Sequence, residues 1–187
     1  MSAFEFLSVG ISFVLGLGVT TVLLSLVRLF RIRATVRWDW IPLAWAMMIF
    51  VAQIQYWWEM FGFGGRSAWA FGDFLLLMIA TLALFVASSV ILPEADDVDA
   101  IDLTSYFNET GRWALVAFAC HVCLLVVINI VLSHLSPFDL LLLSQVLPFA
   151  LMMATFATRS RRVQAVLTGI FLASMLPVLL STVPSIE

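Results

Sequence analysis

The chain has 187 residues, of which 63% are hydrophobic and only 11% charged, and its formal net charge is -3. Soluble domains are about half apolar and about a quarter charged. The composition therefore excludes a water-soluble globule, a disordered chain, a nucleic-acid-binding protein and a disulfide-stapled secreted domain. What remains is an all-α, polytopic membrane protein, and we expect residues 1–187 to form a single integral-membrane domain.

Six apolar stretches are long enough to cross a membrane as helices. A spanning helix needs about 20 apolar residues, because the hydrocarbon core is about 30 Å thick. In chain order, the predicted spans are residues 6–30, 41–63, 69–92, 113–135, 138–158 and 163–183. Pro42 falls in the first turn of the second span, where its missing N–H costs little, and Pro93 ends the third span. The sequence thus predicts a six-helix transmembrane bundle.

The connection at residues 93–112 is the one long polar segment. Apolar residues at helical spacing between residues 103 and 113 predict a short amphipathic helix at the cytoplasmic interface between spans three and four. Asp102 or Thr104 is expected to cap this helix. We interpret the acidic residues as a solvated loop, and binding of a divalent cation or of a basic partner subunit is the alternative. These carboxylates are Asp96, Asp97, Asp99 and Asp102.

The distribution of basic residues predicts the orientation. All nine are arginines, and all except Arg66 follow spans one, three and five. The positive-inside rule places those connections in the cytoplasm, so both termini are expected outside. Because no targeting segment is recognised, we expect a multi-pass protein of the inner membrane of a bacterium. The arginines expected to fix this topology and to attract anionic lipid headgroups, at about 1 kcal/mol each, are Arg28, Arg31, Arg33, Arg37, Arg159, Arg161 and Arg162.

Small residues four apart mark possible packing faces on three spans. Such residues let helix backbones approach closely in lipid, where no hydrophobic drive brings helices together. We expect these faces to pack inside the bundle, and a homodimer through one of them is the alternative. They are Ser8, Ser12, Gly16 and Thr20 in span one, Ala150, Ala154 and Thr158 in span five, and Ala165, Gly169 and Ala173 in span six.

Polar side chains at membrane depth are costly and therefore mark candidate functional positions. Counting about 1.5 Å per residue from the span ends places three amides in the outer half of the membrane and two carboxylates at its mouth. Gln55 and Glu59 are one turn apart and share a helix face. The residues expected to line an outward-facing polar pocket are Gln53, Gln55, Glu59, Asp73, His121, Asn129 and Gln145.

The sequence favours a transporter or channel-like protein for a polar solute or a cation through this pocket. One alternative is a structural or sensory subunit of a membrane complex, acting through its helix faces and acidic loop. A third hypothesis is a haem or redox protein that uses His121. Both histidines lie on one predicted helix, however, and zinc needs four converging ligands. We therefore expect no metal and no cofactor, favour a non-enzymatic protein over an enzyme, and expect membrane lipids as partners.

Overall fold

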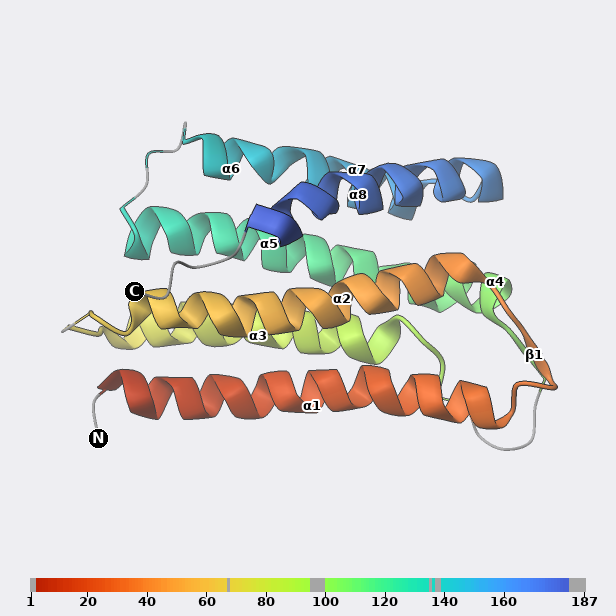
Figure 1. Cartoon of the computed structure of the whole chain (residues 1–187), viewed down its shortest axis with the longest axis horizontal. Helices are drawn as coiled ribbons and strands as arrows, with labels where there is room; N and C mark the ends of the chain where they lie inside the picture. Colours follow the sequence, from red (N-terminus) through yellow and green to blue (C-terminus); the bar gives the residue numbers. More distant parts are fainter. Residues whose placement is uncertain (1–2, 67, 95–99, 135, 137–138, 182–187) are drawn as a thin grey trace.

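The computed structural model describes residues 3–66, 68–94, 100–134, 136 and 139–181, which fold almost entirely into helices (Figure 1). The long helices are α1 (Ala3–Arg31), α2 (Trp40–Glu59), α3 (Phe71–Val90), α5 (Trp113–Leu132), α7 (Val146–Ala157) and α8 (Arg161–Ser181). The short elements are β1 (Val36–Arg37), η1 (Met60–Phe63), β2 (Ile101–Asp102), α4 (Leu103–Tyr106), the π-helical η2 (Phe107–Gly111) and α6 (Leu140–Ser144). The prediction of an all-α chain is confirmed.

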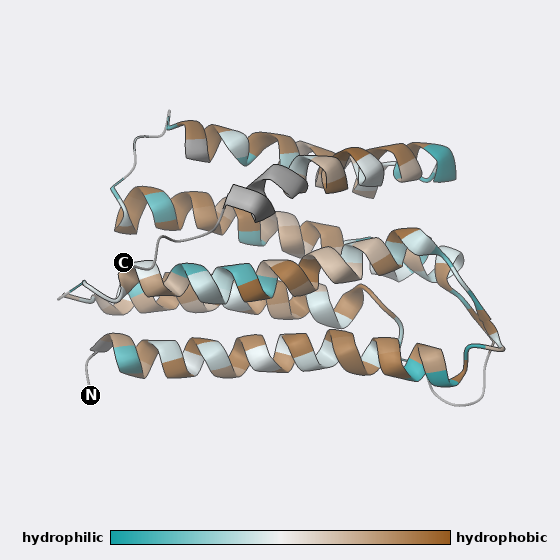
Figure 2. Cartoon of the chain, viewed as in Figure 1, coloured by the Kyte–Doolittle hydropathy of each residue, from teal (hydrophilic) through white to brown (hydrophobic). Residues whose placement is uncertain are grey.

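Three helices are long and apolar enough to cross a membrane. They cover Phe4–Arg31, Phe71–Val90 and Trp113–Leu132, and they correspond to the first, third and fourth predicted spans. The second and sixth predicted spans correspond to α2 and α8, which have 20 and 21 residues. The half of α2 that leads to Glu59 carries more hydrophilic residues than its first half (Figure 2). The chain is therefore compatible with a membrane protein.

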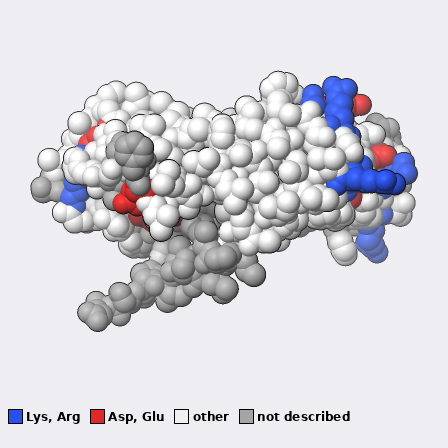
Figure 3. Space-filling model, turned by 90° about the horizontal axis from the view of Figure 1, so that it is seen from above, with Lys and Arg blue, Asp and Glu red and all other residues white. Residues whose placement is uncertain are grey.

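Successive long helices run in opposite directions. Helices α1, α3 and α6–α7 run one way, and α2, α5 and α8 run the other (Figure 1). As a result, the end of α1 lies at the same end of the molecule as the beginnings of α2, α5 and α8. Most of the arginine side chains on the face shown gather there (Figure 3). We call this the arginine end, and the other the opposite end.

Helix α3 packs against both α1 and α5, and α1 meets its neighbours through large apolar residues four or seven positions apart, on one face of the helix. These buried residues are Ile11, Leu15, Val22 and Leu29. The small-residue face predicted for this helix does not pack in the same way, since Gly16 and Thr20 are exposed. Ala154 on α7 and Gly169 on α8 are exposed as well. The prediction that these four residues pack inside the bundle is wrong, because the larger side chains fill the interior.

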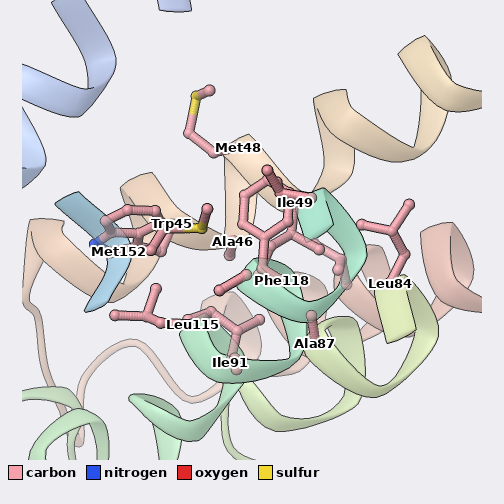
Figure 4. Packing of buried hydrophobic residues seen from close by; sticks show 14 of the residues in the cluster. Trp45, Ala46, Met48, Ile49, Leu84, Ala87, Ile91, Leu115, Phe118 and Met152 are labelled. Carbon is pink, nitrogen blue, oxygen red and sulfur yellow. The ribbon is translucent and has the colours of Figure 1, made fainter. Parts of the chain in front are cut away.

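The apolar core lies where α2, α3, α5 and α7 meet (Figure 4). Trp45 of α2 is fully buried there, and its indole Nε1 donates a hydrogen bond of 3.0 Å to Thr168 Oγ1 of α8. The Trp45 and Phe171 rings are 4.5 Å apart. Because a buried indole N–H needs an acceptor, Thr168 fixes the rotation of α8 relative to α2.

In the connection between α3 and α5, β2 forms a two-residue parallel pair with β1, which lies between α1 and α2. Asp102 caps α4 by accepting hydrogen bonds from the N–H groups of Thr104 (2.8 Å) and Ser105 (3.2 Å), and it pairs with Arg37 at 3.2 Å. The backbone N–H groups of Ser105 and Thr104, together with the Arg37 guanidinium, hold the pKa of the Asp102 carboxyl below its usual range. Of the two predicted caps, Asp102 is confirmed.

The helix predicted for residues 103–113 is present as α4 and η2, but it packs differently from an interfacial helix. Leu103 and Phe107 are buried in the core of the bundle, so its apolar face contacts protein. Tyr106 donates to the carbonyls of Val90 (2.9 Å) and Leu92 (3.2 Å). These carbonyls lie at the end of α3 and lack helical partners, so this connection closes that helix.

The fifth predicted span is present as a helix with a one-residue break. Helix α6 ends at Ser144, Gln145 forms a turn, and α7 follows. Pro148 has no N–H to donate to the Ser144 carbonyl, which is its usual partner four residues back. The Gln145 N–H instead bonds to the carbonyl of Leu142, three residues back, at 3.1 Å. Gln145 keeps right-handed helical backbone angles, so α6 and α7 together form the predicted fifth helix with a one-residue break, and this break places Gln145 beside the cavity described next.

Candidate functional site

A cavity of about 570 Å³ lies between α2, α5, α6–α7 and α8. Four elements far apart in the sequence form its wall, so it exists only in the folded bundle. Of the seven residues predicted to line one pocket, five contribute to this wall. They are Gln55, Glu59, His121, Asn129 and Gln145.

The polar part of the wall lies toward the opposite end, where α2 and α5 finish and α6 begins. Gln55 Nε2 donates a hydrogen bond of 3.2 Å to Glu59 Oε1, one turn further along α2. The Asn129 side chain donates to the carbonyl of Leu125 in its own helix at 3.0 Å. Gln145, at the break in the fifth span, is half-buried. Three amide side chains and a carboxylate thus border one shared space from three helices.

The deeper wall is apolar. Met48 of α2, Phe118 of α5, Met152 of α7 and Phe171 of α8 line it. Along α2, the eleven residues from Met48 to Glu59 correspond to about 16 Å of rise. The cavity therefore changes from apolar at mid-depth to polar near the opposite end.

His121 borders the cavity at the apolar level and is buried. Its Nδ1 lies 2.9 Å from the carbonyl oxygen of Ala80 on α3. A carbonyl only accepts, so Nδ1 carries a proton in this contact and Nε2 is the remaining polar atom of the ring. Tyr56 stands edge-on to the imidazole, with the ring centroids 5.1 Å apart, and donates to the Leu77 carbonyl at 3.1 Å. Protein groups on two other helices thus hold the histidine in place.

The other two residues predicted to line the pocket lie outside the cavity. Gln53 is buried between α1 and α3, where its Nε2 donates to Ser88 Oγ at 2.8 Å. Asp73 accepts from the Ala70 N–H at the start of α3, at 3.1 Å, and pairs with Arg66, also at 3.1 Å. In these positions Gln53 links helices, and Asp73 anchors a turn at the opposite end.

A buried ion pair at the arginine end was not predicted. The Asp39 side chain is 2% exposed and pairs with Arg161, the first residue of α8. It also caps α2 by accepting from the Ile41 N–H at 2.9 Å, and it accepts from the Thr104 hydroxyl at 2.9 Å. An Asp directly before an apolar helix is a typical N-cap. That signal was available in the sequence, whereas the distant partner on α8 was not.

A second unpredicted polar contact lies nearby. Gln164 of α8 is fully buried, and its Nε2 donates to Asn108 Oδ1 and to the Thr158 carbonyl, both at 3.0 Å. It therefore ties α8 to the π-helical connection. Asp39 and Gln164 together hold α8, which lines part of the cavity, against α2 and against the segment between α3 and α5.

The remaining predicted residues belong to the loops and the arginine end. Asp102 serves as the α4 cap, while Asp96, Asp97 and Asp99 lie outside the described residues. Arg37 and Arg161 hold the ion pairs given above. The exposed arginines without an ion pair among those found in the described ranges are Arg28, Arg31, Arg33, Arg159 and Arg162.

Metal-binding chemistry and known proteins give no further assignment. Within the part of the chain that the structure describes, no three His, Cys, Asp or Glu side chains are grouped so that they could hold a metal ion. Cys120 and Cys123 are exposed, with free thiols. No protein-family model, curated protein or solved structure matches the chain significantly.

Proposed function

We propose that the chain is a six-span transporter or channel-like protein of a bacterial inner membrane that takes up a polar solute or a cation in the cavity between α2, α5, α6–α7 and α8. The cavity itself is the observation that carries this proposal. It brings Gln55, Glu59, Asn129 and Gln145 from three helices to one volume. A volume of about 570 Å³ falls in the range of small-molecule sites.

The interrupted fifth span supports this function. In many transporters a broken helix lines the substrate site, because irregular backbone at membrane depth is tolerated only inside protein or beside a water-filled cavity. Here α6 and α7 meet at Gln145, and both Gln145 and Pro148 border the cavity.

The six-span topology is supported by the lengths and ends of the helices. Trp40 and Trp57 of α2 are exposed, and 17 residues separate them, which corresponds to about 26 Å of helix. Exposed tryptophans near both ends suit the two headgroup regions of a bilayer of about 30 Å. With the arginine end in the cytoplasm, the polar part of the cavity faces outside.

Thiol labelling checks this orientation. In a background with Cys120 and Cys123 replaced by Ser, Gly65→Cys and Glu109→Cys place exposed thiols at the two ends. We expect a membrane-impermeant maleimide to label Gly65→Cys in intact cells and Glu109→Cys only after permeabilisation. The reverse pattern would contradict the orientation, and labelling of both in intact cells would contradict the transmembrane arrangement.

The cavity is tested with the same reagents. Thiols react as thiolates, which need water. Asn129→Cys and Gln145→Cys should therefore react with the maleimide added outside at least about tenfold faster than a thiol in lipid or in the packed interior. The matched controls on α2 are Ile54→Cys, whose side chain faces outward (48% exposed), and the buried Gln53→Cys. Equal rates at all four positions would contradict a water-filled site and, with it, the proposed function.

A further inference from the structure

We infer that the cavity selects an amphiphilic organic cation, whose charged head lies against Glu59 and whose apolar body lies against the deeper methionine and phenylalanine wall. This inference rests on the proposed function and narrows its solute from any polar molecule or cation to one chemical class. Its first support is the gradient along the cavity, which is polar near Glu59 and apolar about 16 Å deeper along α2.

The charge of the site comes from one side chain. Glu59 is the acidic residue of the described cavity wall, and no Lys or Arg lines that wall with it. Its hydrogen-bond partner Gln55 is neutral. Arg66, at the same end, forms an ion pair with Asp73 at 3.1 Å, and its guanidinium carbon lies 5.3 Å from the centroid of the Trp69 ring. Glu59 is therefore a carboxylate without a cation of its own among the described residues, and a positively charged head would supply one.

The apolar wall excludes a bare inorganic ion as the best ligand. Hard cations such as Ca²⁺ require six or more oxygen ligands, and the described residues hold no group of three acidic or metal-ligating side chains. Phe118, Phe171, Met48 and Met152 offer surface that an apolar body covers favourably. Aromatic faces also attract organic cations. An anionic amphiphile would meet Glu59 without a compensating arginine or lysine.

The test measures binding of (3-phenylpropyl)trimethylammonium to the full chain in phosphatidylcholine nanodiscs by equilibrium dialysis, with empty nanodiscs subtracted. Two further probes separate the contribution of the positive charge to binding from that of the apolar body. They are the neutral isostere, in which carbon replaces nitrogen, and tetramethylammonium, which lacks the phenylpropyl group. We expect the full cation to bind about tenfold more tightly than either, since tenfold corresponds to about 1.4 kcal/mol.

Glu59→Gln should weaken the cation about tenfold and leave the neutral isostere unchanged, because only the charge interaction is lost. The matched control is Glu5→Gln, which removes the same charge from α1, outside the cavity. The inference is overturned if cation and isostere bind equally, if Glu59→Gln has no effect, or if no probe binds while Gln145→Cys is still labelled. Failure of that labelling would instead overturn the proposed function.

Discussion

Replacing Asp39 by Ala is expected to lower the free energy of unfolding by about 2–4 kcal/mol. The substitution removes the α2 cap at Ile41, the acceptor of the Thr104 hydroxyl and the partner of Arg161. Breaking a fully buried ion pair costs about 3–5 kcal/mol. The Arg161 side chain is 37% exposed and can turn toward water, so we expect a loss that reaches from just below that range to its middle. Reversible unfolding in detergent measures the change.

Two further variants separate the contributions of Asp39. Asn caps helices about as well as Asp, so Asp39→Asn should keep the cap and lose the charge pairing. A double-mutant cycle with Arg161→Gln then isolates the ion pair. The control is Arg162→Ala, an exposed neighbour that should change stability by no more than about 0.5 kcal/mol. If Asp39→Ala behaved like this control, the buried ion pair would have no energetic role.

Gly18→Ala is expected to destabilise the protein by about 1–2 kcal/mol, although Ala is the better helix former. A methyl group at Gly18 would overlap Gln53 Oε1 and come within 3.5 Å of Ser88 Oγ. Gln53 cannot move away freely, because it is buried and its Nε2 is bonded to Ser88. The contact therefore requires α1 to separate from α2 and α3, or the amide to lose its partner.

The sign of this effect should reverse when Gln53 is shortened. In a Gln53→Ala background the overlap is gone, so Gly18→Ala should stabilise the chain by about 0.5–1 kcal/mol through helix propensity alone. Gly16→Ala is the matched control, because no described atom apart from its chain neighbours and its own helix backbone lies within 4 Å of the added Cβ, and it should stabilise the wild-type chain similarly. Destabilisation by Gly18→Ala in both backgrounds would contradict the close approach of α1 to Gln53.

The sequence predicts the position of each polar residue along its helix, but not the direction in which its side chain faces. Position along a helix follows from the rise per residue, which is a constant of the helix. Direction depends on which neighbour each face meets, and the spans are apolar on all sides. Gln53 and Gln55 are two residues apart and so lie on nearly opposite faces. Gln53 lies between α1 and α3, whereas Gln55 borders the cavity with Glu59.

Other differences also have physical reasons. The break at Gln145 follows from Pro148, a signal that is present in the sequence but was outweighed by the length of the apolar run. The partner of Asp39 could not be predicted, since sequence spacing does not show which residues meet when they are 122 positions apart. The helical character of the connection before α5 was correctly predicted. Its burial depends on space left between α3 and α5, which only the folded bundle defines.

The long sequence distance between these contacting residues also determines when the contacts can form during synthesis. Asp39 and Trp45 find their α8 partners, Arg161 and Thr168, only after 122 and 123 further residues have been synthesised. The buried carboxylate before α2 is therefore neutralised, and the Trp45 indole bonded, only once α8 has been made. Helix α8 also completes the cavity wall. A nascent chain that stops before α8 can hold α1, α3 and α5 together, yet it carries neither a finished binding space nor a neutralised Asp39, so the site appears only after α8 has been synthesised.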